Sequence, residues 1–147
     1  MKGAKNLPLT DNEKERQKEI KEIIDKIKPH ITAFSYTIQK NSKQKDEVTC
    51  GGKVKYIVDM GMLTDDHRQR LIYVTIDDTL GDLLVVVPAV FWDQVNITVG
   101  DIIVATGIVF RPEKVCDFVS EAGTTITVPQ EDDPFRILVK SIRKISS

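Results

Sequence analysis

Five short runs of aliphatic and β-branched residues fill most of the chain after Val48, and they limit its fold more than any other sequence feature. Glycine, proline and aspartate bound these runs, and that combination predicts β-strands separated by turns. The predicted strands are Lys53–Val58, Arg70–Asp77, Leu83–Val87, Ile102–Phe110 and Phe135–Ile142. The larger part of the chain is therefore expected to be all-β.

The connections between these strands favour one architecture, the five-stranded OB-fold Greek-key barrel. Ala89–Val95 predicts a short helical or irregular connector between the third and fourth strands, which an SH3-like barrel normally lacks. An Ig-like sandwich would need about seven strands. Residues 111–134 are expected to form a long acidic loop with a minor strand at Thr124–Val128. We assign the OB-fold domain to residues 48–147.

The preceding segment, residues 1–47, predicts an amphipathic helix, a short strand and a polar linker. Thr10 and Glu13 form a capping box at the start of the helix, and Pro29 ends it. The apolar stripe of this helix consists of Ile20, Ile23, Ile24 and Ile27. His30–Ile38 alternates like a strand, and Gln39–Glu47 has the composition of a linker.

Charge and composition exclude several classes of protein. Residues 1–49 hold 11 Lys and Arg against 8 Asp and Glu, a net charge of +3, whereas residues 50–147 hold 10 against 14, a net charge of −4. A strongly basic nucleic-acid-binding domain is therefore excluded. The absence of a long apolar run or a signal peptide, and of a CxxC pair, indicates a reduced cytoplasmic protein with no membrane contact.

The sequence offers no recognisable catalytic or metal-binding motif. Walker A, GxGxxG and GxSxG patterns are absent, and no His/Cys cluster has zinc-site spacing. The acidic pair Asp77–Asp78 fits a turn, and Thr64–His67 fits a polar loop. We expect a protein that is not an enzyme and that has no metal and no cofactor.

Several short patterns between residues 50 and 110 resemble one type of OB domain. The matching segments are Gly52–Val54, Leu71–Gly81, Leu83–Pro88, Phe91, Gly100–Asp101 and Gly107–Val109. They are similar to the OB domains of bacterial replicative DNA polymerase III α subunits and of aminoacyl-tRNA synthetase anticodon-binding domains. Residues 135–145 fit the last strand, and residues 1–47 lie outside the resemblance. It implies binding of single-stranded nucleic acid without catalysis, with DNA in replication or repair more plausible than RNA.

Side-chain alternation indicates which residues could contact such a ligand. If Ile72, Val74 and Ile76 face the core, Tyr73 faces outward and is the best candidate for base stacking. The same rule places Tyr56 in the core. The predicted nucleic-acid-binding residues are Lys53, Lys55, Arg70, Tyr73, Phe110, Arg111 and Lys114.

The outward side of the second and third strands would also carry an apolar patch of Leu71, Tyr73, Leu84 and Val86. Either the isoleucine stripe of the N-terminal helix covers this patch, or a partner protein or second copy does. An alternative function is therefore a protein-interaction subunit that docks a replication enzyme or forms a homo-oligomer. Its predicted interface residues are Leu71, Leu84, Val86, Ile20, Ile24 and Ile27.

Overall fold

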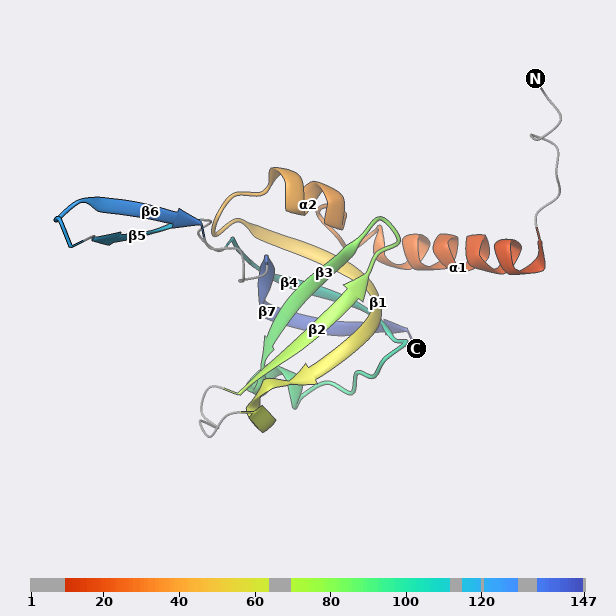
Figure 1. Cartoon of the computed structure of the whole chain (residues 1–147). Helices are drawn as coiled ribbons and strands as arrows, with labels where there is room; N and C mark the ends of the chain where they lie inside the picture. Colours follow the sequence, from red (N-terminus) through yellow and green to blue (C-terminus); the bar gives the residue numbers. More distant parts are fainter. Residues whose placement is uncertain (1–9, 64–69, 112–114, 120, 130–134, 147) are drawn as a thin grey trace, which may run out of the picture.

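The centre of the molecule is a closed, five-stranded sheet, and an N-terminal helix meets it with its C-terminal end and extends away from it (Figure 1). The computed structural model describes residues 10–63, 70–111, 115–119, 121–129 and 135–146. The barrel strands are β1 (Glu47–Asp59), β2 (Leu71–Asp77), β3 (Asp82–Pro88), β4 (Ile102–Phe110) and β7 (Arg136–Ser146). They close in the order β1-β2-β3-β7-β4, with β3 and β7 parallel and the other neighbours antiparallel. This arrangement is OB-fold-like, as the sequence predicts.

The barrel interior is filled by the alternate residues expected from the sequence. Ile72, Val74 and Ile76 of β2 are fully buried, and Leu83, Val85 and Val87 of β3 are buried opposite them. Because successive side chains of a strand point to opposite faces, Tyr73 and Leu84 lie on the outside of the barrel. The alternation rule is therefore confirmed for β2 and for most of β3, but Val86, predicted to be part of an exposed patch, is buried.

The rule is wrong for the second half of β1, because the strand contains a β-bulge. Val54 pairs with Ile76, but the next pairs are Tyr56 with Thr75 and Ile57 with Val74, which leaves Lys55 as an extra residue. One extra residue reverses the facing of everything after it. Ile57 packs against the core, while Tyr56, predicted to be buried, is 61% exposed.

Helix α1 (Asp11–Ile27) begins with the predicted cap, since Glu13 N donates to Thr10 Oγ1 at 3.1 Å. Ile23 and Ile27 are buried against Ile102 and Val104 of β4. One of our two explanations for the apolar patch required this helix to cover β2 and β3. That explanation is wrong, because the helix packs on β4 instead. Gly51 of β1 permits this contact, because a Cβ there would lie 3.0 Å from Cγ2 of Ile27.

The predicted strand at His30–Ile38 is wrong, because Ser35–Asn41 forms the helix α2. Phe34, Tyr36 and Ile38 alternate, but Phe34 and Ile38 are also one helical turn apart, so the pattern fits both structures. Two hydrogen bonds from Ser35 to the buried Asp78, at 2.5 and 2.8 Å, fix the start of the helix. Ile38 completes the barrel core from this side.

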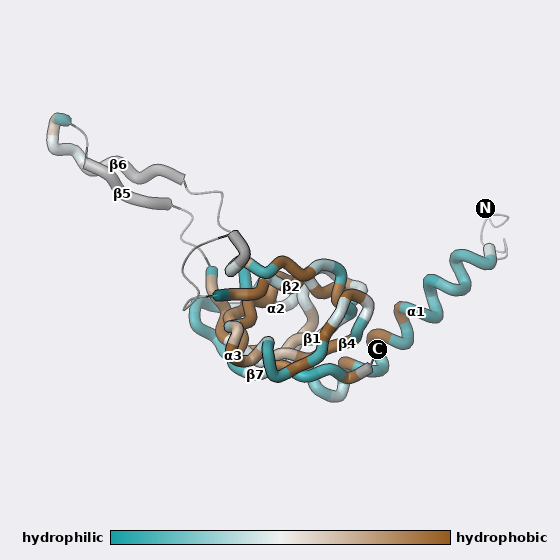
Figure 2. The backbone as a smooth tube through the Cα atoms, turned by 90° about the horizontal axis from the view of Figure 1, so that it is seen from below, coloured by the Kyte–Doolittle hydropathy of each residue, from teal (hydrophilic) through white to brown (hydrophobic). Residues whose placement is uncertain are grey.

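The remaining elements lie at the barrel rim or outside it. The 3₁₀ helix η2 (Met60–Leu63) follows β1, and the short helix α3 (Ala89–Trp92) is the predicted connector. β5 (Val115–Val119) and β6 (Thr125–Pro129) form a separate two-stranded sheet, where the sequence predicts a loop with one minor strand. This hairpin, which we call the arm, lies apart from the barrel strands (Figure 1). Figure 2 shows hydrophobic residues along the barrel strands and mostly hydrophilic residues along α1.

Candidate ligand-binding face of the barrel

One side of the barrel, formed by β1, β2, β3 and β7, carries apolar side chains that α1 does not cover. A continuous row runs across the four strands, because Val58 pairs with Tyr73, Tyr73 with Val86, and Val86 with Leu138. A second row joins Tyr56, Thr75 and Leu84. Val58 is 45% exposed and Leu138 is 40% exposed. We call these two rows, together with Leu71, the outer face.

Two tyrosines stand on this face in neighbouring strands. Tyr56 lies opposite Thr75, two residues along β2 from Tyr73, so the tyrosines are diagonal neighbours on one side of the sheet. Tyr73 is half-buried, and the ammonium of Lys55 lies 5.7 Å from the centre of the Tyr56 ring. Sequence analysis found Tyr73 but missed Tyr56, because nothing in the alternation of β1 marks the bulge at Lys55.

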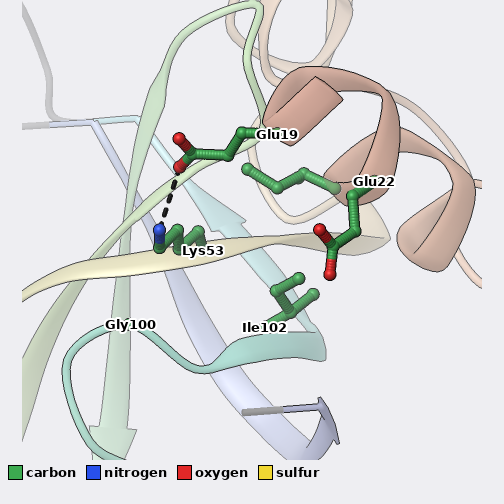
Figure 3. A pocket seen from close by; sticks show the side chains of 6 residues that line it. Glu19, Glu22, Lys53, Gly100 and Ile102 are labelled. Atoms are coloured by element: carbon green, nitrogen blue, oxygen red, sulfur yellow. Dashed lines mark hydrogen bonds and ion pairs between the residues drawn. The ribbon is translucent and has the colours of Figure 1, made fainter. Parts of the chain in front are cut away.

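Three of the five basic residues predicted to contact phosphates, Lys53, Lys55 and Arg70, each have a carboxylate partner. Lys53 Nζ lies 2.9 Å from Glu19 of α1, at a pocket between that helix and the barrel (Figure 3). Lys55 Nζ lies 2.9 Å from Asp82. The hydrogen bond with Lys53 lowers the pKa of Glu19, and the bond to Asp82 raises the pKa of Lys55.

Arg70 is held by two aspartates at the end of the barrel that carries η2. Its guanidinium donates to Asp59 at 2.7 and 2.9 Å, and Asp93 lies 3.4 Å away. The hydrogen bond from Arg70 lowers the pKa of Asp59, and the same bond raises the pKa of Arg70. A phosphate would therefore have to compete with carboxylates for Lys53, Lys55 and Arg70.

Phe110 and Arg111 lie at the base of the arm instead of beside Tyr73. The guanidinium of Arg136 lies 4.4 Å from the centre of the Phe110 ring, and that of Arg111 lies 4.9 Å from the Phe135 ring. Arg111 also donates to the Ser42 carbonyl at 2.7 Å and to the Gln39 carbonyl, at the end of α2. These two residues therefore connect structural elements, and Lys114 lies outside the described residues.

The predicted interface residues divide into two places that the structure does not bring together. Leu71 and Leu84 are half-buried on the outer face, and Val86 is buried between its register partners Tyr73 and Leu138. On α1, Ile27 is completely buried against the barrel, so it serves an internal contact. The other two predicted interface residues on this helix, Ile20 and Ile24, are half-buried.

Within the described ranges, no group of three or more His, Cys, Asp or Glu side chains is placed to hold a metal ion. The two buried carboxylates, Asp78 and Asp101, both accept hydrogen bonds from neighbouring loops and helices. None of the helices in the described part of the chain is long and apolar enough to cross a membrane.

Comparison with known proteins supports the fold and leaves the ligand open. The sequence matches no family model and no curated protein. Among solved structures, the chain is similar to one described as the hypothetical protein ygiW from E. coli, with a TM-score of 0.50 and 18% sequence identity. The similarity covers 77% of this chain and 88% of that chain. It shows a shared OB-fold-like, five-stranded closed sheet with an N-terminal helix.

Proposed function

We propose that this protein is a non-catalytic accessory protein that binds single-stranded nucleic acid, more plausibly DNA than RNA, on the outer face of its barrel. The observation that carries this proposal is the pair Tyr56 and Tyr73, which present two aromatic rings diagonally on adjacent strands. Stacking on aromatic rings is tolerant of base sequence and contributes about 1–3 kcal/mol per base. In OB barrels the ligand surface is commonly this side, around the second and third strands.

The location of the acidic residues supports the proposal. Residues 112–134, which contain the arm, hold one Lys against six Asp and Glu, a net charge of −5. The rest of residues 50–147 holds nine Lys and Arg against eight Asp and Glu, a net charge of +1. The acidic excess therefore lies in the arm segment, and the barrel itself is close to neutral.

The direct test measures the affinity of single-tyrosine variants for a fluorescently labelled, single-stranded oligonucleotide by anisotropy at low salt. We expect Tyr56→Ala and Tyr73→Ala each to weaken binding roughly tenfold, because each removes one stacking ring. Tyr36→Ala is the matched control, since Tyr36 has the same 61% exposure as Tyr56 but lies on α2. Binding unaffected by both face variants, or weakened equally by the control, would contradict the proposal.

A second candidate function is a protein-interaction subunit, and one observation favours it. Lys53, Lys55 and Arg70 are all paired with carboxylates, while Val58 and Leu138 leave apolar surface exposed. Leu138→Lys would then disrupt assembly with a partner or second copy, whereas on a nucleic-acid-binding face the added cation should strengthen oligonucleotide binding. Sedimentation velocity of the wild type and this variant, beside the anisotropy measurement, distinguishes the two functions.

A further inference from the structure

Among the described residues, the outer edges of the arm pair with no other strand. β5 and β6 pair with each other along their whole length, from Val115 opposite Pro129 to Val119 opposite Thr125. Neither strand belongs to the barrel sheet. A two-stranded hairpin is only marginally stable in water by itself, and its outer edges carry main-chain donors and acceptors that a further strand can pair with. The arm therefore has the backbone geometry of a docking element.

Contacts at the base of the arm hold its two ends together. Phe110, at the end of β4, is paired with Arg136, at the start of β7. Arg111 directly follows Phe110, and Phe135 directly precedes Arg136. In both pairs an arginine lies over an aromatic ring, at 4.4 and 4.9 Å. Such cation–π contacts contribute about 0.5–1 kcal/mol at exposed sites. We call these four residues the neck; they fix both ends of the arm segment to the barrel.

Charge indicates what kind of chain would pair with the arm. Within its described residues the arm holds Asp117 and Glu121 and neither Lys nor Arg, and this negative charge opposes a second copy of the same arm and opposes nucleic acid. A basic, extended protein segment is complementary to it. We propose that the arm docks such a segment by strand addition to the free edge of β5, independently of the ligand on the barrel face.

The β5 edge is favoured over the β6 edge by the backbone chemistry. β6 ends at Pro129, which has no N–H to donate, whereas every residue of Val115–Val119 has one. Asp117 gives the centre of β5 an acidic position, and opposite charges on neighbouring strands stabilise pairing. In strand addition the main-chain hydrogen bonds supply affinity and the side chains supply selectivity.

The test uses the full chain and two synthetic peptides, one alternating lysine with valine and one alternating glutamate with valine. We expect the lysine peptide to bind and to shift the amide NMR signals of residues 115–119, and the glutamate peptide to have no effect. In the arm-deleted variant, a short glycine–serine turn joins Arg111 to Phe135. A tight connection is feasible because the preceding and following residues, Phe110 and Arg136, are paired across β4 and β7. Deletion should weaken lysine-peptide binding roughly tenfold or more, since it removes the main-chain partners.

A second variant, Asp117→Asn with Glu121→Gln, keeps the test decisive if the deletion impairs folding. It should weaken lysine-peptide binding by about twofold to fivefold. Equal binding of both peptides, or binding unaffected by either variant, would overturn the proposal. It would also be overturned if deletion abolished oligonucleotide binding, which would place the arm in the nucleic-acid site, or if deletion converted a dimer to a monomer.

Discussion

Lys55 determines which side chains in the second half of β1 reach the surface of the barrel. As the extra residue of the β1 bulge, it turns Tyr56 and Val58 outward and Ile57 inward. Sequence periodicity predicted the inward side chains of β2 and β3 correctly, because neither strand contains a bulge between its paired residues. It could not predict Tyr56, because a bulge leaves no signature when the residues on both sides of it are apolar or basic.

Cys50 offers a test of core packing at the scale of one residue. Burial, reinforced by the negative charge of Asp78, raises its pKa to about 12. The thiolate is the reactive form, so Cys50 should be inert toward thiol reagents near pH 8 while the barrel is folded. In a Cys116→Ser background, labelling should begin only as denaturant unfolds the protein. Rapid labelling of the native state would contradict the packing described for β1.

At the scale of elements, the two helices differ in how far the sequence could place them. The capping box and the isoleucine stripe predicted α1 and the residue at which it begins. They could not predict that α1 packs on β4, since an apolar stripe indicates that a helix is buried on one side but not against which element. α2 was mistaken for a strand, because its position depends on Asp78, 43 residues further along the chain. No local pattern reports a contact of that kind.

The link between α2 and the β2–β3 turn should contribute measurably to stability. Asp78→Ala removes the acceptor of Ser35 N and Ser35 Oγ and leaves both groups buried without a partner. We expect a loss of about 2–4 kcal/mol in the free energy of unfolding, measured by urea denaturation. Asp82→Ala, an exposed carboxylate on β3, is the control and should change stability little. Similar losses in both variants would show that Asp78 has no special structural role.

At the scale of the whole molecule, the charge is divided among three parts. Residues 1–49 carry +3, the barrel carries +1 and residues 112–134 carry −5, so the total of −1 describes none of them. The closed five-stranded sheet was predictable, because turn residues bound each run of aliphatic and β-branched residues. The arm was predicted as a loop with one minor strand, since residues 111–134 are acidic and only Thr124–Val128 is a run rich in β-branched residues.

The pairing of cations with carboxylates gives the proposed nucleic-acid binding an expected salt dependence. Each phosphate neutralised on a single strand contributes about −0.7 to the slope of log affinity against log salt. Because Lys53, Lys55 and Arg70 already have carboxylate partners, we expect a slope of about −1 or shallower. Anisotropy titrations at several salt concentrations measure it. A slope several times steeper would mean that phosphate contacts, and not tyrosine stacking, dominate.

The position of β7 has a consequence for biosynthesis. It is the last barrel strand along the chain, yet it pairs with both β3 and β4 and so closes the barrel. Until residues 136–146 have left the ribosome, β3 and β4 lack a neighbour and the hydrophobic interior stays open. Contacts between distant segments also form slowly. The nascent chain therefore passes through a stage with two bare strand edges, at which chaperones or aggregation would compete with folding.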